Sequence, residues 1–203
     1  MLVLIVNYKM NNLGSITRAL EECGASVVVS DNPADLVGAD KVVIPGVGAF
    51  ADAMNNLNTM GWTSALRQAV LEQKKYVLGI CLGMQLLADV GFESGQTPGL
   101  GLIPGSVVRL MSKNLFERIP HVGWNEIYQT ASSPLFNNVP DGSDFYFVHS
   151  YTVAAPADAV IATTPYCGSF AAAVNVGRVF GVQFHPEKST PVGFEVLKNF
   201  LAL

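Results

Sequence analysis

The sequence has few cysteines and few charges, and these shortages exclude several classes of protein. Its 203 residues include three widely spaced cysteines, Cys23, Cys81 and Cys167, and no CxxC pair. We therefore expect neither a disulfide scaffold nor a structural zinc site, and a reducing cytoplasm is the expected location. Lysine and arginine number 12 against 16 aspartates and glutamates. Without a basic excess to neutralise phosphates, we expect no nucleic-acid partner.

Long apolar runs, phosphate-binding loops and metal motifs are missing as well. The apolar segment Met1–Val6 is interrupted by Asn7 and has no basic residues before it, so neither a signal peptide nor a membrane span is expected. No GxxxxGKS/T, GxGxxG or HExxH is present, so we expect no cofactor and no metal. Half of the residues are hydrophobic, which suffices for a core in one domain over residues 1–203.

Short β-branched segments alternate with helical segments in the first part of the chain. Leu2–Val6 is apolar throughout, which is typical of a strand buried on both faces of a sheet. In Asn11–Cys23 the apolar residues recur at helical spacing. This alternation predicts a parallel sheet with helices on both faces. Further strands are expected at Ser26–Ser30, Lys41–Ile44 and Tyr76–Ile80, and a helical region interrupted near Gly61 at Ala51–Gln73.

The second part of the chain, from Gly99 to Phe184, contains strand-like segments with few helical stretches. Turn signals such as Pro104-Gly105 separate these segments. They predict an antiparallel extension of the sheet, closed by a helix over Phe194–Leu203, where apolar residues return at helical spacing. The expected fold class is therefore α/β, with an open, mostly parallel sheet and an antiparallel extension.

The pentapeptide Gly79-Ile80-Cys81-Leu82-Gly83 lies between an expected strand and an expected helix over Leu82–Val90, as in a nucleophile elbow. Glycines are needed on both sides of the nucleophile because the turn is tight. The turn places the thiol of Cys81 at a helix N-terminus, which favours the reactive thiolate. A small buried apolar residue is the alternative role for a lone cysteine. The two glycines favour the nucleophile.

A thiolate nucleophile needs a base, and the base needs an orienting group. His185 follows the apolar run Val179–Phe184 and precedes Pro186, which favours extended backbone at His185. In extended backbone, side chains two positions apart point the same way, so Glu187 is expected to orient His185. His149, inside an apolar strand, suits a structural role better, and His121 is expected in a loop.

An acyl-transfer site also needs hydrogen-bond donors for the developing oxyanion. The Gly-rich segment Pro45–Phe50 follows an expected strand, and its backbone N–H groups are candidates, as is the N–H of Leu82. An ordinary Gly-rich turn explains this segment equally well.

Five sequence blocks resemble triad-type (class I) glutamine amidotransferases, which hydrolyse the side-chain amide of glutamine through a thioester. GICLGMQLL around Cys81 and GVQFHPEKS around His185 are similar to the two signatures of that family. IPGVGAF, IPHVGWN and YFVHSY narrow the resemblance to the glutaminase subunits of imidazole glycerol phosphate synthases, which serve histidine biosynthesis. The blocks extend from Lys41 to Ser189, and the resemblance implies a flavodoxin-like fold.

The resemblance also implies a role for individual residues. It makes Cys81 the nucleophile, His185 the general acid and base, and Glu187 the residue that orients it. Gln85 lies one helical turn after Cys81, hence on the same face. The implied oxyanion hole comprises Gly46, Val47, Gly48 and Leu82, and the implied glutamine contacts are Gln85, Glu93, Ser150 and Tyr151.

Ammonia released by such a subunit needs an acceptor. The resemblance implies a heterodimer with a cyclase subunit, a (β/α)₈ barrel that makes imidazole glycerol phosphate and aminoimidazole carboxamide ribotide. The segment Asn7–Asn12 departs from the DYGMGN of many relatives, which leaves a related synthase with another ammonia acceptor as an alternative. A stand-alone cysteine hydrolase and a silent interaction module are further alternatives. The expected interface residues are Lys188, His121, Gly123, Trp124 and Asn125.

Overall fold

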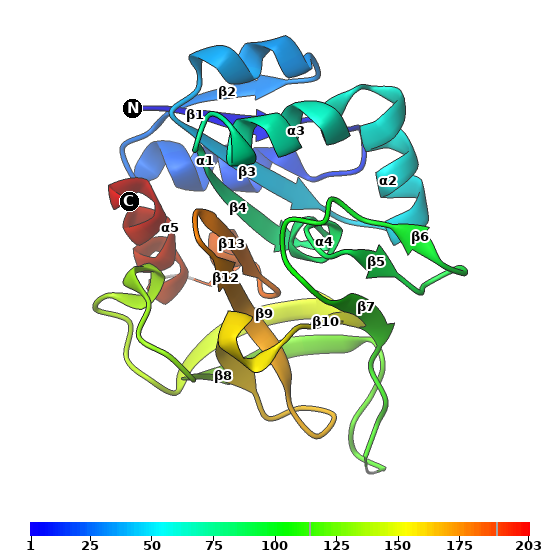
Figure 1. The fold of residues 1–203 in the computed structure, drawn as a ribbon. Coiled ribbons are helices and arrows are strands. Elements are labelled where there is room, and N and C mark those ends of the chain that lie inside the picture. The colour runs from blue at the N-terminus through cyan, green and yellow to red at the C-terminus, as the bar shows by residue number, and fades with distance from the viewer. Residues whose placement is uncertain (114, 190) are drawn as a thin grey trace.

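The computed structural model describes residues 1–113, 115–189 and 191–203, and within these ranges the largest sheet has nine strands (Figure 1). Its strands, in chain order, are β1 (Leu2–Val6), β2 (Ser26–Ser30), β3 (Lys41–Gly46), β4 (Tyr76–Cys81), β8 (His121–Gln129), β9 (Ser143–His149), β11 (Val160–Thr164), β12 (Phe170–Val176) and β13 (Val179–Val182).

The nine-stranded sheet has a parallel half and an antiparallel half, in the spatial order β2-β1-β3-β4-β13-β12-β11-β8-β9. The pairs from β2 to β13 are parallel, and those from β13 to β9 are antiparallel. The register pairs Gly46 with Cys81, so the Gly-rich segment and the elbow emerge side by side at the carboxyl edge of the sheet. The predicted α/β class with an antiparallel extension is confirmed.

Helices cover both faces of the sheet, and each face has its own hydrophobic core. Ile16, Leu20 and Phe200 belong to the core under α1 and α5, which pack together near the two termini (Figure 1). Trp62 and Leu57 belong to the core on the opposite face. The helices are α1 (Leu13–Glu22), α2 (Phe50–Thr59), α3 (Trp62–Leu71), α4 (Leu82–Leu86) and α5 (Val192–Ala202).

The helix after the elbow is shorter than predicted. The expected helix over Leu82–Val90 is wrong in its second half, because α4 ends at Leu86. The carbonyls of Leu86 and Leu87 accept hydrogen bonds from the backbone of Leu100 and Leu102, so a distant loop takes the acceptors that a longer helix would use. Val90 begins a small four-stranded sheet formed by β5 (Val90–Gly91), β6 (Thr97–Pro98), β7 (Ser106–Arg109) and β10 (Tyr151–Ala154).

Two local expectations also need correction. His121 is the first residue of β8 and pairs with His149 of β9, so His121 lies in a strand and not in a loop. Pro186–Lys188 forms a 3₁₀ turn, and only His185 before it has extended backbone. Glu187 therefore reaches His185 through a turn and not along an extended strand.

Candidate active site

Cys81 lies at the junction of β4 and α4 in a backbone conformation that side chains rarely adopt. Its φ is 53° and its ψ is −110°, and its side chain is largely buried. Such strain persists only where the surroundings impose it, and it is common at active sites. A Cβ at Gly83 would collide with the carbonyl of Ile44, and one at Gly79 would lie 2.6 Å from the carbonyl oxygen of Gly83. Both glycines are thus required for the elbow to form.

His185 and Glu187 form a buried ion pair beside the elbow. Nδ1 of His185 lies 2.8 Å from Oε1 of Glu187, and the two side chains are only 5% and 7% exposed. The backbone N–H of His185 donates to the carbonyl of Tyr146, and the hydroxyl of Ser189 donates to the carbonyl of His185. These bonds hold the histidine in place and leave Nε2 without a hydrogen-bond partner among the described residues.

The charge state of His185 follows from its neighbours. Burial alone would lower the pKa of His185, but its interactions with Cys81 and Glu187 outweigh burial and raise that pKa to about 10. The ring is therefore protonated at neutral pH. A positive imidazolium next to a sulfur stabilises the thiolate, which is the nucleophilic form.

A pocket of about 250 Å³ opens beside Cys81 at the carboxyl edge of the sheet. This volume suits a small polar molecule better than a nucleotide. All the residues implied to bind glutamine line it, together with two of the oxyanion residues from the Gly-rich segment. Its lining residues are Val47, Gly48, Cys81, Leu82, Gln85, Glu93, Val148, His149, Ser150 and Tyr151.

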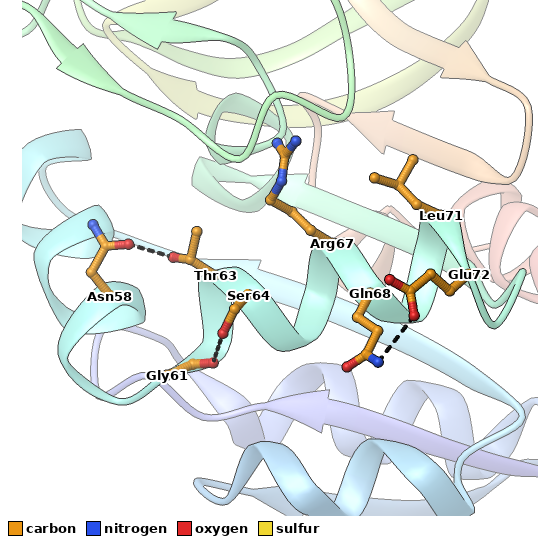
Figure 2. Close-up of a pocket in the computed structure, with 8 residues that line it drawn as sticks. All are labelled: Asn58, Gly61, Thr63, Ser64, Arg67, Gln68, Leu71 and Glu72. Atoms are coloured by element: carbon orange, nitrogen blue, oxygen red, sulfur yellow. Dashed lines mark hydrogen bonds between the residues drawn. The ribbon is translucent and has the colours of Figure 1, made fainter.

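A larger pocket, of about 570 Å³, lies along α3 and contains no member of the triad (Figure 2). Figure 2 shows that several of its polar groups are already paired with one another. Thr63 donates to Asn58, and Gln68 donates to Glu72. This pocket has the size of a ligand site but contains neither a cysteine nor a histidine, so the smaller pocket at Cys81 is the candidate active site.

Gln85 belongs to a buried amide pair that joins the pocket wall to the nucleophile. Its Nε2 donates to the carbonyl of Tyr151 at 2.8 Å and to Oε1 of Gln183 at 3.1 Å. Nε2 of Gln183 in turn lies 3.7 Å from the sulfur of Cys81. Gln183 was not predicted from the sequence. A glutamine inside the apolar run before His185 was the available signal, because a buried amide needs a polar partner.

Glu93 reaches the pocket from the loop between β5 and β6. Its Oε2 accepts a hydrogen bond of 2.6 Å from the backbone N–H of Phe50, the first residue of α2. A carboxylate at this position also stabilises the positive end of the helix. Glu93 therefore has a structural task in addition to its place in the pocket.

The expected oxyanion donors differ in whether their N–H groups are already hydrogen-bonded. Leu82 is the first residue of α4, so its N–H has no acceptor within the helix and is positioned beside the sulfur. The N–H of Val47 instead donates to the carbonyl of Met10 at 3.0 Å and is already engaged. Gly48 has a φ of +109°. The Gly-rich segment is thus in place, but its central donor is turned to another acceptor.

Tyr8 lies directly behind this segment. Its ring is fully buried, and its hydroxyl has no hydrogen-bond partner in the part of the chain that the structure describes. A Cβ at Gly46 would collide with this hydroxyl. Burial, with a smaller contribution from Cys81, raises the pKa of Tyr8 far above its ordinary value, so the phenol is neutral. From the sequence, Tyr8 was only part of the divergent segment Asn7–Asn12, with no role predicted for it.

The expected interface residues separate into two sets. Trp124 is 53% exposed, and Val122 lies opposite Val148 with both side chains exposed. Lys188 places its ammonium 5.5 Å from the ring of Tyr146. His121, in contrast, is only 2% exposed and faces inward. Because side chains alternate along a strand, Gly123 and Asn125 share the side of His121 and not that of Trp124.

Within the described ranges, no helix is long and apolar enough to cross a membrane. The same residues contain no cluster of three histidine, cysteine, aspartate or glutamate side chains arranged to hold a metal ion.

Comparisons with known proteins agree with this geometry. The family profile "Glutamine amidotransferase class-I" matches residues 4–203. "Imidazole glycerol phosphate synthase subunit HisH 1" of Campylobacter jejuni is 45% identical, with all of both chains covered. The corresponding HisH subunit of Moorella thermoacetica is 47% identical over 98% of this chain and 93% of its own.

Solved structures support the fold. "Crystal structure of glutamine amidotransferase" is similar with a TM-score of 0.76 at 19% identity, covering 98% of this chain and 97% of that one. "Structure of PurLQS from Thermotoga maritima" has a TM-score of 0.75 at 20% identity, with 99% and 97% covered.

Proposed function

This chain belongs to the class-I glutamine amidotransferase family, and from that premise we propose that Cys81, His185 and Glu187 are its catalytic triad. Full-length relatives at 45% and 47% identity are subunits of imidazole glycerol phosphate synthase. The chain is accordingly a glutaminase subunit of histidine biosynthesis. The observation that carries the triad is the 2.8 Å contact between His185 and Glu187 next to the strained elbow at Cys81.

In the first half of the reaction, the thiolate of Cys81 attacks the side-chain amide carbon of L-glutamine. The carbonyl oxygen becomes an oxyanion, and its negative charge is stabilised by the N–H of Leu82 at the start of α4. The protonated Nε2 of His185 then gives its proton to the departing nitrogen. The C–N bond breaks, ammonia leaves, and a γ-glutamyl thioester remains on the sulfur.

In the second half, His185 is neutral and takes a proton from a water molecule. The resulting hydroxide attacks the thioester carbon, the C–S bond breaks, and glutamate leaves with the thiolate restored. Glu187 accepts a hydrogen bond from Nδ1 throughout, so that Nε2 always faces the reacting atoms.

Four residues of the pocket recognise glutamine. Gln85 and Glu93 hold the backbone carboxylate and ammonium of the substrate, and the main chain at Ser150 and Tyr151 also lines the pocket. The second oxyanion donor, Val47, requires its bond to Met10 to be released. We expect this release when the partner subunit binds its own ligand, so the isolated chain idles.

The partner is a cyclase subunit of (β/α)₈-barrel type, and it docks on the exposed apolar side of the β8–β9 pair. Val122, Trp124 and Val148 give this surface its apolar character, and the exposed Val47 extends it toward the oxyanion segment. Lys188 adds a positive charge beside it. Ammonia then passes to the cyclase. The cytoplasm stays the expected location.

Glutamate release from glutamine tests this function in three states: the chain alone, with the cyclase, and with the cyclase and its ribulosyl substrate. Cys81→Ala is the control in each. Strong stimulation in the third state, absent in Cys81→Ala, supports the proposal. Activity that depends on Cys81 but ignores the cyclase would point to a related synthase or a stand-alone hydrolase. No release in any state would overturn the triad assignment.

A further inference from the structure

Two buried histidines connect strand β8 to the glutamine pocket through hydrogen bonds. Nδ2 of Asn125 lies 2.8 Å from Nε2 of His121, and Nδ1 of His121 lies 3.0 Å from Nε2 of His149. Nδ1 of His149 lies 2.8 Å from the carbonyl oxygen of Tyr151, a residue of the pocket wall. Neither histidine takes part in the triad chemistry.

Only one assignment of the imidazole protons satisfies all of these hydrogen bonds. Burial lowers the pKa of His121 to about 4 and that of His149 to about 3, so each ring carries one proton at neutral pH. The carbonyl of Tyr151 can only accept, so Nδ1 of His149 must be its donor. Nε2 of His149 is then an acceptor and takes the proton of His121 Nδ1. Asn125 donates to the remaining nitrogen of His121.

This series of hydrogen bonds ends on the carbonyl oxygen of Tyr151, which also positions the proposed substrate-binding residue Gln85. The carbonyl of Tyr151 accepts a second hydrogen bond, from Gln85, which is itself paired with Gln183 next to Cys81. Both lone pairs of this carbonyl are thus used. Its orientation sets the position of Gln85.

Packing alone does not explain two imidazoles at these positions. His121 stacks on Tyr166 and Phe147 with ring centroids 4.0 and 4.9 Å apart, and His149 contacts Phe170 at 4.8 Å. Phenylalanine would fill such an aromatic cluster without the cost of burying polar nitrogen atoms. The nitrogens are therefore retained for their directional hydrogen bonds.

We propose that His121 and His149 are positioning residues for glutamine, and that their one-way chain of N–H donors ties the pocket wall at Tyr151 to Asn125 on β8. The proposal rests on the proposed glutaminase function. It gives the inward side of β8 a task distinct from its exposed apolar side, because a displacement of β8 changes the support of Tyr151 and Gln85.

The kinetic test uses His121→Phe in the complex with the cyclase and its substrate. This change keeps the ring stack and removes both nitrogens. We expect the KM for glutamine to rise about tenfold while kcat changes less than twofold, because the reacting atoms are untouched. Tyr166→Phe is the matched control. It removes hydrogen bonds between Tyr166 and Arg118 within the same aromatic stack, but Tyr166 is not part of the hydrogen-bonded series from Asn125 to Tyr151. It should leave KM unchanged.

The spectroscopic test needs no variant. Nitrogen-15 NMR of the imidazole rings at neutral pH should show protons on Nδ1, and none on Nε2, for both His121 and His149. A proton on Nε2 of either ring, or an unchanged KM in His121→Phe, would overturn the proposal. Failure of the glutaminase function itself is distinguishable, because it would appear in the wild-type complex as no glutamate release above Cys81→Ala.

Discussion

The two sides of the nucleophile differ in how far they are assembled. On one side, His185 and Glu187 are in contact at 2.8 Å, and the backbone of the histidine is tied to Tyr146 and Ser189. On the other side, the N–H of Val47 is bonded to Met10 and turned from its expected task. The groups proposed to transfer protons are thus preorganised, whereas the proposed oxyanion hole is half complete. Activation of such a site therefore requires completion of the oxyanion hole, and the triad residues do not have to move.

The largest expected effects lie on the preorganised side. Replacing His185 by Gln removes proton transfer to the leaving ammonia and should reduce kcat by about 10⁴-fold or more. Glu187→Gln keeps a polar partner for Nδ1 and should cost about 10- to 100-fold less than loss of His185, because it orients and does not transfer protons. Stimulated glutamate release measures both. Equal losses would contradict this division of roles.

The incomplete side can be probed by deleting one donor. Val47→Pro removes the backbone N–H that is expected to complete the oxyanion hole. The ligand-stimulated rate in the complex should fall about 10²-fold, since one oxyanion donor contributes on that scale. The assay uses saturating cyclase, because Val47 also lies on the proposed docking surface and weaker binding of the partner must not limit the rate. Full stimulation in Val47→Pro would show that Val47 is not a donor.

The charge on His185 predicts a pH dependence of stability. Its pKa is about 10 in the folded chain and near 6.5 when unfolded, so the folded state binds more protons between these values. This contribution to the free energy of unfolding is full below pH 6.5 and is lost as pH rises through 10. Urea denaturation from pH 6 to 10 measures it. In His185→Gln the slope in this window should be reduced; an identical slope would refute the charged histidine.

The smallest expected effect concerns the tyrosine behind the oxyanion segment. Tyr8→Phe removes a buried hydroxyl without a partner in the described structure and leaves the ring in its core. The free energy of unfolding should stay the same or rise by about 1 kcal/mol. Thermal unfolding provides the measurement, with Tyr76→Phe as the control for loss of a partly exposed hydroxyl. A clear loss of stability would mean that the hydroxyl of Tyr8 has a partner.

Sequence patterns predicted those strands and turns that are determined by residues close together in the chain. The bounds of Leu2–Val6 and Ser26–Ser30 are confirmed as predicted, because an apolar β-branched run between turn signals has few other uses. The elbow was predictable because two glycines at fixed spacing around Cys81 are typical of this turn, and a Cβ at either glycine would clash with neighbouring backbone. The partnership of His185 and Glu187 was also anticipated, although the turn that creates it was not.

Predictions failed where distant segments compete for the same groups. The helix after Cys81 stops at Leu86 because backbone N–H groups from residues 100–103 occupy its carbonyls. His121 was assigned to a loop, but pairing with β9 turns its side chain inward. Gln183 gained its significance only from contact with Gln85 and Cys81.

The sequence by itself determined the α/β class and the family, and it led to the proposal of Cys81 as the nucleophile and His185 as its base, because each depends on residue types at short, fixed spacings. Only the tertiary structure decided which donors face the pocket, which side of β8 is exposed, and how His121 and His149 order their protons. Those outcomes depend on hydrogen bonds between residues far apart in the chain. Each such group has a small, fixed number of protons or lone pairs, and the fold determines which partners they bind.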